Sequence, residues 1–210
     1  SEVVVRDIIA SKILPEGALQ LLVGLGRGLI DSVDNRDVVT FTGSAATGKI
    51  LQSHPRILSE SVPFNLEADS LNASVLGKKA SPGTVEFDLF IKEAVKEITI
   101  KAGQKCTAVR RIIVPEEYLE EVQKGISARL ASTKIGNPSV EGVRMGPLAS
   151  KAQVKDVKEK VNLLRKSCEV VYGDLDNVEV VGADSERGAF ISSMLLYCKE
   201  PLKNTEPHSI

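Results

Sequence analysis

The sequence predicts an α/β fold in which short apolar strands alternate with amphipathic helices. Three observations support this class: apolar residues recur at helical spacing in three long segments, short apolar segments lie between helices, and glycine or proline marks the junctions. Strands that alternate with helices in this way form a parallel sheet. The 210 residues suffice for one full α/β domain or for parts of two.

The amino-terminal third of the chain contains short elements. We expect the end of a helix at 3–10, a strand at 19–23, a short helical segment at 29–33, a strand at 37–42, a helix at 45–53 and a strand at 72–76. A break containing Pro15 and Gly17 precedes the first strand, and Gly43 and Ser44 separate the second strand from the helix after it.

The remaining two thirds contain the clearest helix, predicted over residues 86–101. Its inward stripe comprises Phe87, Phe90, Ile91, Ala94, Val95 and Ile98. Gly103 is placed to end this helix in the left-handed conformation, and Ser150 to cap a later one. The other elements expected here are strands at 109–114, 169–172 and 190–197 and helices at 116–132 and 150–166.

The composition excludes several kinds of partner. The 27 basic and 28 acidic side chains nearly cancel, so the concentrated positive field that nucleic acid requires is missing. Aromatic residues make up only 4%, which leaves few platforms for base stacking. No apolar run approaches the roughly 18 residues that cross a bilayer. We therefore expect no nucleic acid, no membrane and, with no signal peptide, a cytoplasmic protein.

The three cysteines suggest chemistry at one position. They lie far apart without a CxxC pair, and only two histidines accompany them, so we expect no metal site. A cysteine of this kind is either a buried apolar residue or a nucleophile. Cys168 and Cys198 are expected in the core. Cys106 instead follows a helix stop in a loop, where Lys101 and Lys105 could favour its thiolate.

Residues 43–49 (GSAATGK) match the phosphate-loop pattern G-x-x-x-x-G-K between a strand and a helix. The next residue, Ile50, lacks the hydroxyl that would hold Mg²⁺. A strand, a small-residue turn and a helix amino terminus still favour an anion. Three interpretations remain open: a nucleoside-triphosphate-binding module, a site for another phosphate-bearing ligand, and a purely structural turn.

Residues 65–72 (NLEADSLN) are expected to form an acidic turn at a junction between elements. Taken alone, Glu67 is better explained as a solvated turn residue or a helix cap than as a general base.

Four separated motifs resemble the aldehyde dehydrogenase superfamily in their order and spacing: residues 39–44 (VTFTGS), 66–67 (LE), 103–106 (GQKC) and 144–148 (RMGPL). Residues 67–72 and 101–115 narrow the resemblance. They are similar to the aldehyde dehydrogenase part of bifunctional phenylacetate-degradation enzymes and to relatives that oxidise coenzyme A-linked semialdehydes in benzoate breakdown.

This resemblance implies an NAD(P)-dependent oxidoreductase that converts a semialdehyde to its acid through a thiohemiacetal and a thioester. It implies Cys106 as the nucleophile and Glu67 as the general base. Gly43, Ser44 and Thr47 would line the dinucleotide, with NADP preferred over NAD, and no Mg²⁺ would be needed.

The resemblance also implies the domain organisation. Residues 1–66 would be the carboxy-terminal part of a Rossmann-type nucleotide-binding domain, and residues 67–210 most of an α/β catalytic domain. We expect a fragment that is inactive or nearly so by itself, from a parent enzyme that assembles as a homo-oligomer. The alternatives are the nucleoside-triphosphate-binding module and a non-catalytic assembly domain.

Overall fold

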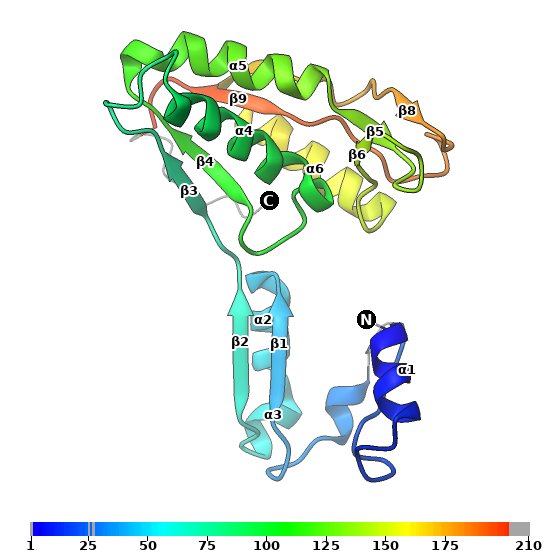
Figure 1. Ribbon diagram of the computed structural model, residues 1–210. Coiled ribbons are helices and arrows are strands. Elements are labelled where there is room, and N and C mark those ends of the chain that lie inside the picture. The colour runs from blue at the N-terminus through cyan, green and yellow to red at the C-terminus, as the bar shows by residue number, and fades with distance from the viewer. Residues whose placement is uncertain (1, 25, 27, 202–210) are drawn as a thin grey trace. The chain divides into compact units, whose positions relative to one another are not determined.

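The computed structural model describes residues 2–24, 26 and 28–201 (Figure 1). The chain divides into two compact units, Ser1–Ala68 and Asp69–Ile210. Each unit has its own sheets and helices and is described by itself.

The first unit is built around one parallel strand pair. Its elements are α1 (Glu2–Ala10), a 3-10 helix (Leu29–Ser32), β1 (Val39–Gly43), α2 (Ala45–Gln52), α3 (Pro55–Ser59) and β2 (Phe64–Ala68). Val39 pairs with Phe64 and Gly43 with Ala68, so both strands end at the same edge. Helix α2 contacts both strands, and a Cβ on the buried Gly48 would collide with Leu66.

The core of the first unit is small. Ile57 on α3 and Val62 are its buried large apolar residues among those described. Arg56 ties this core to the preceding segment, because its Nε donates a 2.7 Å hydrogen bond to the Val33 carbonyl. The side chain of His54 caps α3 by accepting a 3.3 Å hydrogen bond from the Arg56 N–H.

The second unit contains three small sheets. Its strands are β3 (Asn72–Val75), β4 (Val109–Ile113), β5 (Lys134–Gly136), β6 (Val143–Met145), β7 (Cys168–Tyr172), β8 (Val180–Val181) and β9 (Leu195–Cys198). The pairs β3-β4, β5-β6 and β5-β8 are parallel, and β7-β9 is antiparallel. Its helices are α4 (Val85–Thr99), α5 (Leu119–Ala131), α6 (Lys151–Leu164) and 3-10 turns at Ile100–Gly103 and Glu116–Tyr118.

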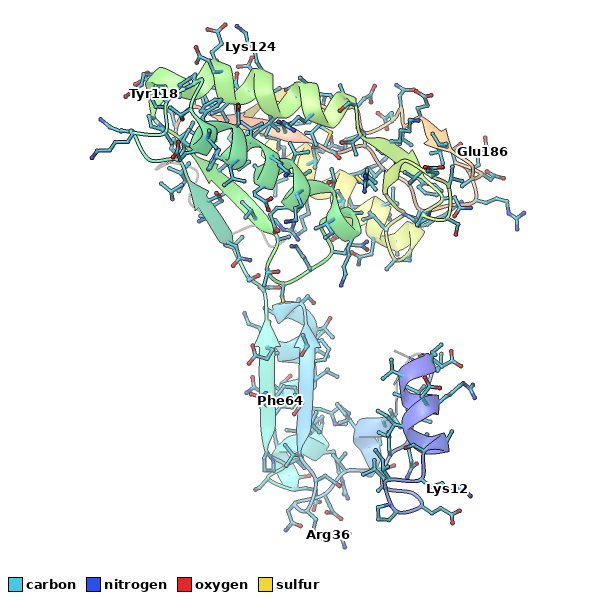
Figure 2. All side chains as sticks on the ribbon, in the orientation of Figure 1. Lys12, Arg36, Phe64, Tyr118, Lys124 and Glu186 are labelled. Atoms are coloured by element: carbon cyan, nitrogen blue, oxygen red, sulfur yellow. The ribbon has the colours of Figure 1, made fainter. Side chains whose placement is uncertain are left out.

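Two apolar clusters stabilise the second unit. The first lies where α4 packs against α5 and β4 (Figure 1). It consists of Leu76, Phe87, Ile91, Ala94, Val95, Val122, Ile126 and Leu130. Four residues of the predicted α4 stripe are therefore buried, and the other two, Phe90 and Ile98, pack against the cluster. The polar face of α5 points outward, as Lys124 does in Figure 2.

The second cluster joins α6 to segments that precede and follow it in the chain. It consists of Met145, Leu148, Val161, Leu175, Ala189 and Ile191. Ser150 caps α6 as predicted, because its hydroxyl accepts a 3.2 Å hydrogen bond from the Gln153 N–H. None of the helices in the described ranges is both long and apolar enough to span a membrane.

The expected strand at 19–23 is wrong. These residues form no strand, and Leu22 and Val23 remain 69% and 78% exposed. An apolar run forms a strand only when a neighbouring strand accepts its backbone hydrogen bonds, and this one has no such neighbour in the described structure.

Other differences have the same tertiary origin. Residues 64–68 form β2 rather than part of an acidic turn, so Glu67 lies in a strand. Strand β9 begins at Leu195 rather than at residue 190, and it runs antiparallel to β7, so the sheets are not all parallel. Helix α4 ends at Thr99, four residues before Gly103, although Gly103 is left-handed as expected with φ of 71°.

Candidate active site

The carboxyl edge of the β1–β2 pair brings together Gly43, Ser44 and Thr47. Gly43 ends β1, and Ser44 is the N-cap of α2. The Ser44 hydroxyl accepts a 3.2 Å hydrogen bond from the Thr47 N–H and donates a 3.0 Å bond to the Thr47 hydroxyl. A Cβ at Gly43 would lie 2.5 Å from the Phe41 ring, so a side chain at this turn would displace that ring.

This edge does not form a phosphate loop of the triphosphatase kind. Helix α2 begins at Ala45, so residues 45–47 before the second glycine are helical rather than a loop around a phosphate. Gly48 is buried against Leu66, and Ile50 is 70% exposed. The turn therefore offers a helix amino terminus at a strand edge, without a metal-holding hydroxyl.

Glu67 lies at the same edge. It pairs in register with Thr42, one residue before Gly43. Side chains alternate along a strand, and Leu66 faces α2, so Glu67 points from the opposite face, where it is exposed. The carboxyl ends of parallel strands are where α/β proteins bind ligands, so the first unit gathers Glu67 and the three predicted cofactor residues at one such edge.

The loop that carries Cys106 begins with an unusual turn. Lys101, Ala102 and Gly103 follow α4 in succession with φ of 52°, 52° and 71°. Residues other than glycine rarely adopt this left-handed conformation, so the surrounding contacts must hold it. One such contact is a 2.8 Å hydrogen bond from the Arg110 guanidinium to the Gly103 carbonyl.

The backbone of Cys106 is fixed from β3 while its side chain is exposed. Asn72, the first residue of β3, donates hydrogen bonds of 2.7 Å to the Cys106 carbonyl and 3.2 Å to the Ala108 carbonyl. The Ser70 hydroxyl also donates to the Cys106 carbonyl. With that carbonyl held inside the loop, the thiol is presented outward.

Gln104 anchors the other side of the loop to the segment after β6. Its amide nitrogen donates to the carbonyls of Lys101 at 2.9 Å and Pro147 at 3.3 Å. Its amide oxygen accepts a 2.8 Å hydrogen bond from the Ala149 N–H. The GQKC and RMGPL motifs, about 40 positions apart, are therefore joined through one side chain.

Lys105 forms an ion pair instead of standing free beside the thiol. Its Nζ lies 2.7 Å from Oε1 of Glu97 on α4, and both side chains are only about a fifth exposed. The other carboxylate oxygen of Glu97 is buried without a hydrogen-bond partner. The charge of Lys105 is thus neutralised by Glu97. Lys105 is therefore not available to favour the Cys106 thiolate, as one of the two lysines was expected to do.

Cys168 and Cys198 are half-buried on β7 and β9 rather than in either apolar cluster.

Within the described ranges, no three His, Cys, Asp or Glu side chains gather as metal ligands. Two open cavities of about 540 and 820 Å³ lie in the second unit, and Cys106 lines neither. The lysines of the larger cavity are paired locally, as Lys158 is with Asp176 at 3.0 Å.

The candidate residues thus fall in two sets. Glu67, Gly43, Ser44 and Thr47 share an edge of the first unit, and Cys106 lies in the second. Sequence reasoning assigned no role to Ser70, Asn72 or Gln104. Residues 67–72 include Ser70 and Asn72, whose side chains can donate hydrogen bonds. Their polar character was the signal from which a role for these two residues could have been inferred.

The fold is of the α/β class, with a helix amino terminus at the carboxyl edge of two parallel strands and an exposed cysteine in a loop held by hydrogen bonds. The model of the aldehyde dehydrogenase family matches residues 1–202. The chain belongs to the aldehyde dehydrogenase family.

Curated relatives refine this likeness. The chain is 46% identical over 206 residues to 3,4-dehydroadipyl-CoA semialdehyde dehydrogenase of Aromatoleum evansii, a match that covers 98% of this chain and 40% of that relative. It is 31% identical over 180 residues to a putative aldehyde dehydrogenase of Staphylococcus haemolyticus, covering 81% of this chain and 35% of the relative. The chain therefore spans less than half the length of these relatives.

Solved structures have the same fold. Betaine aldehyde dehydrogenase of Staphylococcus aureus, in complex with NAD⁺, matches with a TM-score of 0.78 at 20% identity, over 93% of this chain and 37% of that one. An aldehyde dehydrogenase of Pseudomonas syringae, in complex with NAD⁺ and octanal, matches with a TM-score of 0.64 at 22% identity, over 76% of this chain and 31% of that one. The predicted aldehyde dehydrogenase-like α/β fold is confirmed.

Proposed function

We propose that the natural protein is an NAD(P)-dependent dehydrogenase that oxidises a coenzyme A-linked semialdehyde in aromatic-acid catabolism, such as phenylacetate breakdown. The observation that carries this proposal is the 46% identity to a coenzyme A-semialdehyde dehydrogenase along 98% of the chain. Neither a triphosphatase nor a non-catalytic assembly domain is favoured by the family match.

In the proposed reaction, the Cys106 thiolate adds to the aldehyde carbon, and the carbonyl oxygen becomes the oxyanion of a thiohemiacetal. The backbone N–H of Cys106 is the proposed donor to this oxyanion. Collapse of the adduct expels hydride and leaves a thioester on the cysteine. The clamp from Asn72 and the exposure of the thiol support this role, since they present the nucleophile in a fixed loop.

A nicotinamide dinucleotide, when bound, supplies the hydride acceptor. Gly43, Ser44 and Thr47 are the proposed residues for its adenosine and pyrophosphate side. The turn fits a phosphate-bearing group, because Gly43 leaves backbone at the strand edge and the amino terminus of α2 directs its positive end there. NADP is expected to be preferred over NAD.

Glu67 is the proposed general base for the second half of the reaction. Its carboxylate would take a proton from water, and the resulting hydroxide would attack the thioester carbon and expel the Cys106 thiolate. Its place at the carboxyl edge of β2, beside the turn proposed for the cofactor, supports this role.

Rapid-mixing kinetics on the natural full-length protein test these roles. Cys106→Ala is expected to abolish both the burst of reduced cofactor and the acylated enzyme seen by mass spectrometry. Thr107→Ala, at the exposed neighbouring position, is the matched control and should keep both. Glu67→Gln should retain the burst and slow steady turnover, so that acyl-enzyme accumulates. Unchanged turnover in Glu67→Gln would remove that residue from the mechanism.

The substrate class has its own test. A semialdehyde carrying a coenzyme A thioester should give a much higher kcat/KM than the same semialdehyde as a free acid. Equal values would contradict the coenzyme A assignment without contradicting the role of Cys106.

A homo-oligomer and a cytoplasmic location remain predictions, which light scattering and fractionation would check. Because the chain spans 40% of its relative, we also propose that these 210 residues alone do not sustain turnover.

A further inference from the structure

Two cysteines outside the candidate active site face each other across a strand pair. Strands β7 and β9 run antiparallel, and Cys168 pairs in register with Cys198. Directly opposed residues of an antiparallel pair place their side chains on the same face of the sheet. The two thiols are therefore neighbours in space although 30 positions separate them in the sequence.

The backbone separation suits a covalent link. Opposed residues in antiparallel strands have Cα atoms about 4.5 or 5.5 Å apart, depending on the hydrogen-bonding pattern. Disulfides span Cα separations of about 4.4 to 6.8 Å. The Cα separation of either kind of pairing thus falls within the range that a disulfide spans.

The two side chains already interact. Burial raises the pKa of the Cys168 thiol, the hydroxyl of Ser167 at 3.8 Å lowers it, and a hydrogen bond with Cys198 raises it. Both cysteines are half-buried, so part of each remains open to solvent, and no disulfide joins them in this structure. This pair differs from Cys106, which lies on the loop between α4 and β4.

We propose that Cys168 and Cys198 are an oxidative modification site, at which a peroxide converts the two thiols to a disulfide between β7 and β9. One thiol loses its proton, its thiolate attacks a peroxide oxygen, and the O–O bond breaks to give a sulfenic acid, while the departing hydroxide takes up a proton and leaves as water. The second thiol also loses its proton and attacks that sulfur; the S–S bond forms, the S–O bond breaks, and the departing hydroxide takes up the second proton and leaves as a second water. Two sulfurs are oxidised and the peroxide is reduced to water.

The link would fasten strands that belong to the core of the second unit. Tyr172 of β7 and Leu195 of β9 pack against the first apolar cluster, and Leu196 packs against the second. The bond would also close the segment that contains β8. Such a link stabilises the folded chain by restricting the unfolded one, so oxidation should raise the melting temperature.

Peptide mapping of the wild-type chain tests the site directly and needs no variant. After treatment with hydrogen peroxide and digestion without reductant, the peptides containing Cys168 and Cys198 should appear joined, lighter by two hydrogens, and separable by dithiothreitol. Separate sulfinic acids on the two cysteines, or a disulfide from either one to Cys106, would overturn the proposal.

Thermal unfolding gives a second readout. Peroxide should raise the Tm of the wild type by about 5 °C or more, reversibly with dithiothreitol. Cys168→Ser and Cys198→Ser should each lose this shift, whereas Cys106→Ser should retain it. A shift that persists in Cys168→Ser, or its absence in a mapped and linked wild type, would contradict the proposed consequence. Failure of the dehydrogenase assignment would leave both readouts unchanged, because neither measures turnover.

Discussion

The side-chain amide of Asn72 donates a 2.7 Å hydrogen bond to the carbonyl oxygen of Cys106. Asn72 starts β3, and its register partner Val109 starts β4, so this contact joins the beginning of two paired strands to the loop before β4. The same amide nitrogen reaches the Ala108 carbonyl at 3.2 Å. One side chain thus fixes two carbonyls that flank the exposed Thr107.

Asn72→Ala should slow the proposed reaction of Cys106. Loss of the two hydrogen bonds releases the loop, and misplacing a nucleophile by about 1 Å costs roughly 100-fold in rate. We expect kcat to fall about 10- to 100-fold with a smaller change in KM, measured by steady-state kinetics on the full-length protein. The rate of Cys106 alkylation should change in the same variant.

Asn162→Ala, at an exposed position of α6, is the matched control and should leave both rates as they are. If Asn72→Ala keeps the wild-type kcat, the clamp has no part in catalysis.

Gln104→Glu should distinguish the hydrogen bonds that the Gln104 amide nitrogen donates from the one that its amide oxygen accepts. A carboxylate still accepts from the Ala149 N–H but can no longer donate to the carbonyls of Lys101 and Pro147. We expect a loss of about 1–2 kcal/mol in the free energy of unfolding, measured with urea, because two carbonyls then face an anion. Gln104→Ala, which removes all three bonds, should lose a similar amount or more. Wild-type stability in both variants would show that the contact contributes nothing.

Lys105→Met should destabilise the second unit by leaving the carboxylate of Glu97 without its cation. The pair is largely buried, and one Glu97 oxygen has no other partner. We expect a loss of about 2–3 kcal/mol. The double variant Glu97→Gln/Lys105→Met should recover most of it, because the unpaired charge is gone. Additive losses in this double-mutant cycle would mean that the two side chains act independently.

Gly173→Ala should destabilise the chain through its backbone. Gly173 has φ of 99°, and a Cβ there would collide with the Ser193 carbonyl oxygen. We expect a loss of about 2 kcal/mol or more in urea unfolding. Gly77→Ala is the matched control, because a Cβ at Gly77 meets nothing within 4 Å and its φ is not positive. Equal effects of the two substitutions would contradict this explanation.

Periodicity identified the elements that carry long apolar patterns. Helix α4 was predicted with its buried face because Phe87, Ile91 and Val95 repeat at helical spacing over about two turns. The strand at residues 64–68 was missed although its residues alternate between apolar and polar, because residues 65–72 were interpreted together as one acidic turn. The stability of this short strand comes from pairing with β1. The apolar run at 19–23 was predicted as a strand but forms none, since no strand of the described structure pairs with it.

The candidate site divides in the same way. Cys106 and Glu67 were identified from motifs, whose residue types are visible in the sequence. The clamp by Asn72 and the bridge by Gln104 were not, because each joins segments more than 30 positions apart. The expected help from Lys105 was lost because the turn after α4 brings its Nζ to Glu97, which lies eight positions earlier near the end of that helix.

The sequence by itself determined the family, the α/β class and the identity of the candidate nucleophile, because motifs and periodic patterns are local properties of the chain. Only the tertiary structure decided which groups hold that nucleophile in place, which lysine is neutralised and which two cysteines face each other. Those relationships depend on strand register and on helix packing, which bring distant residues within hydrogen-bond distance, and no local pattern specifies them.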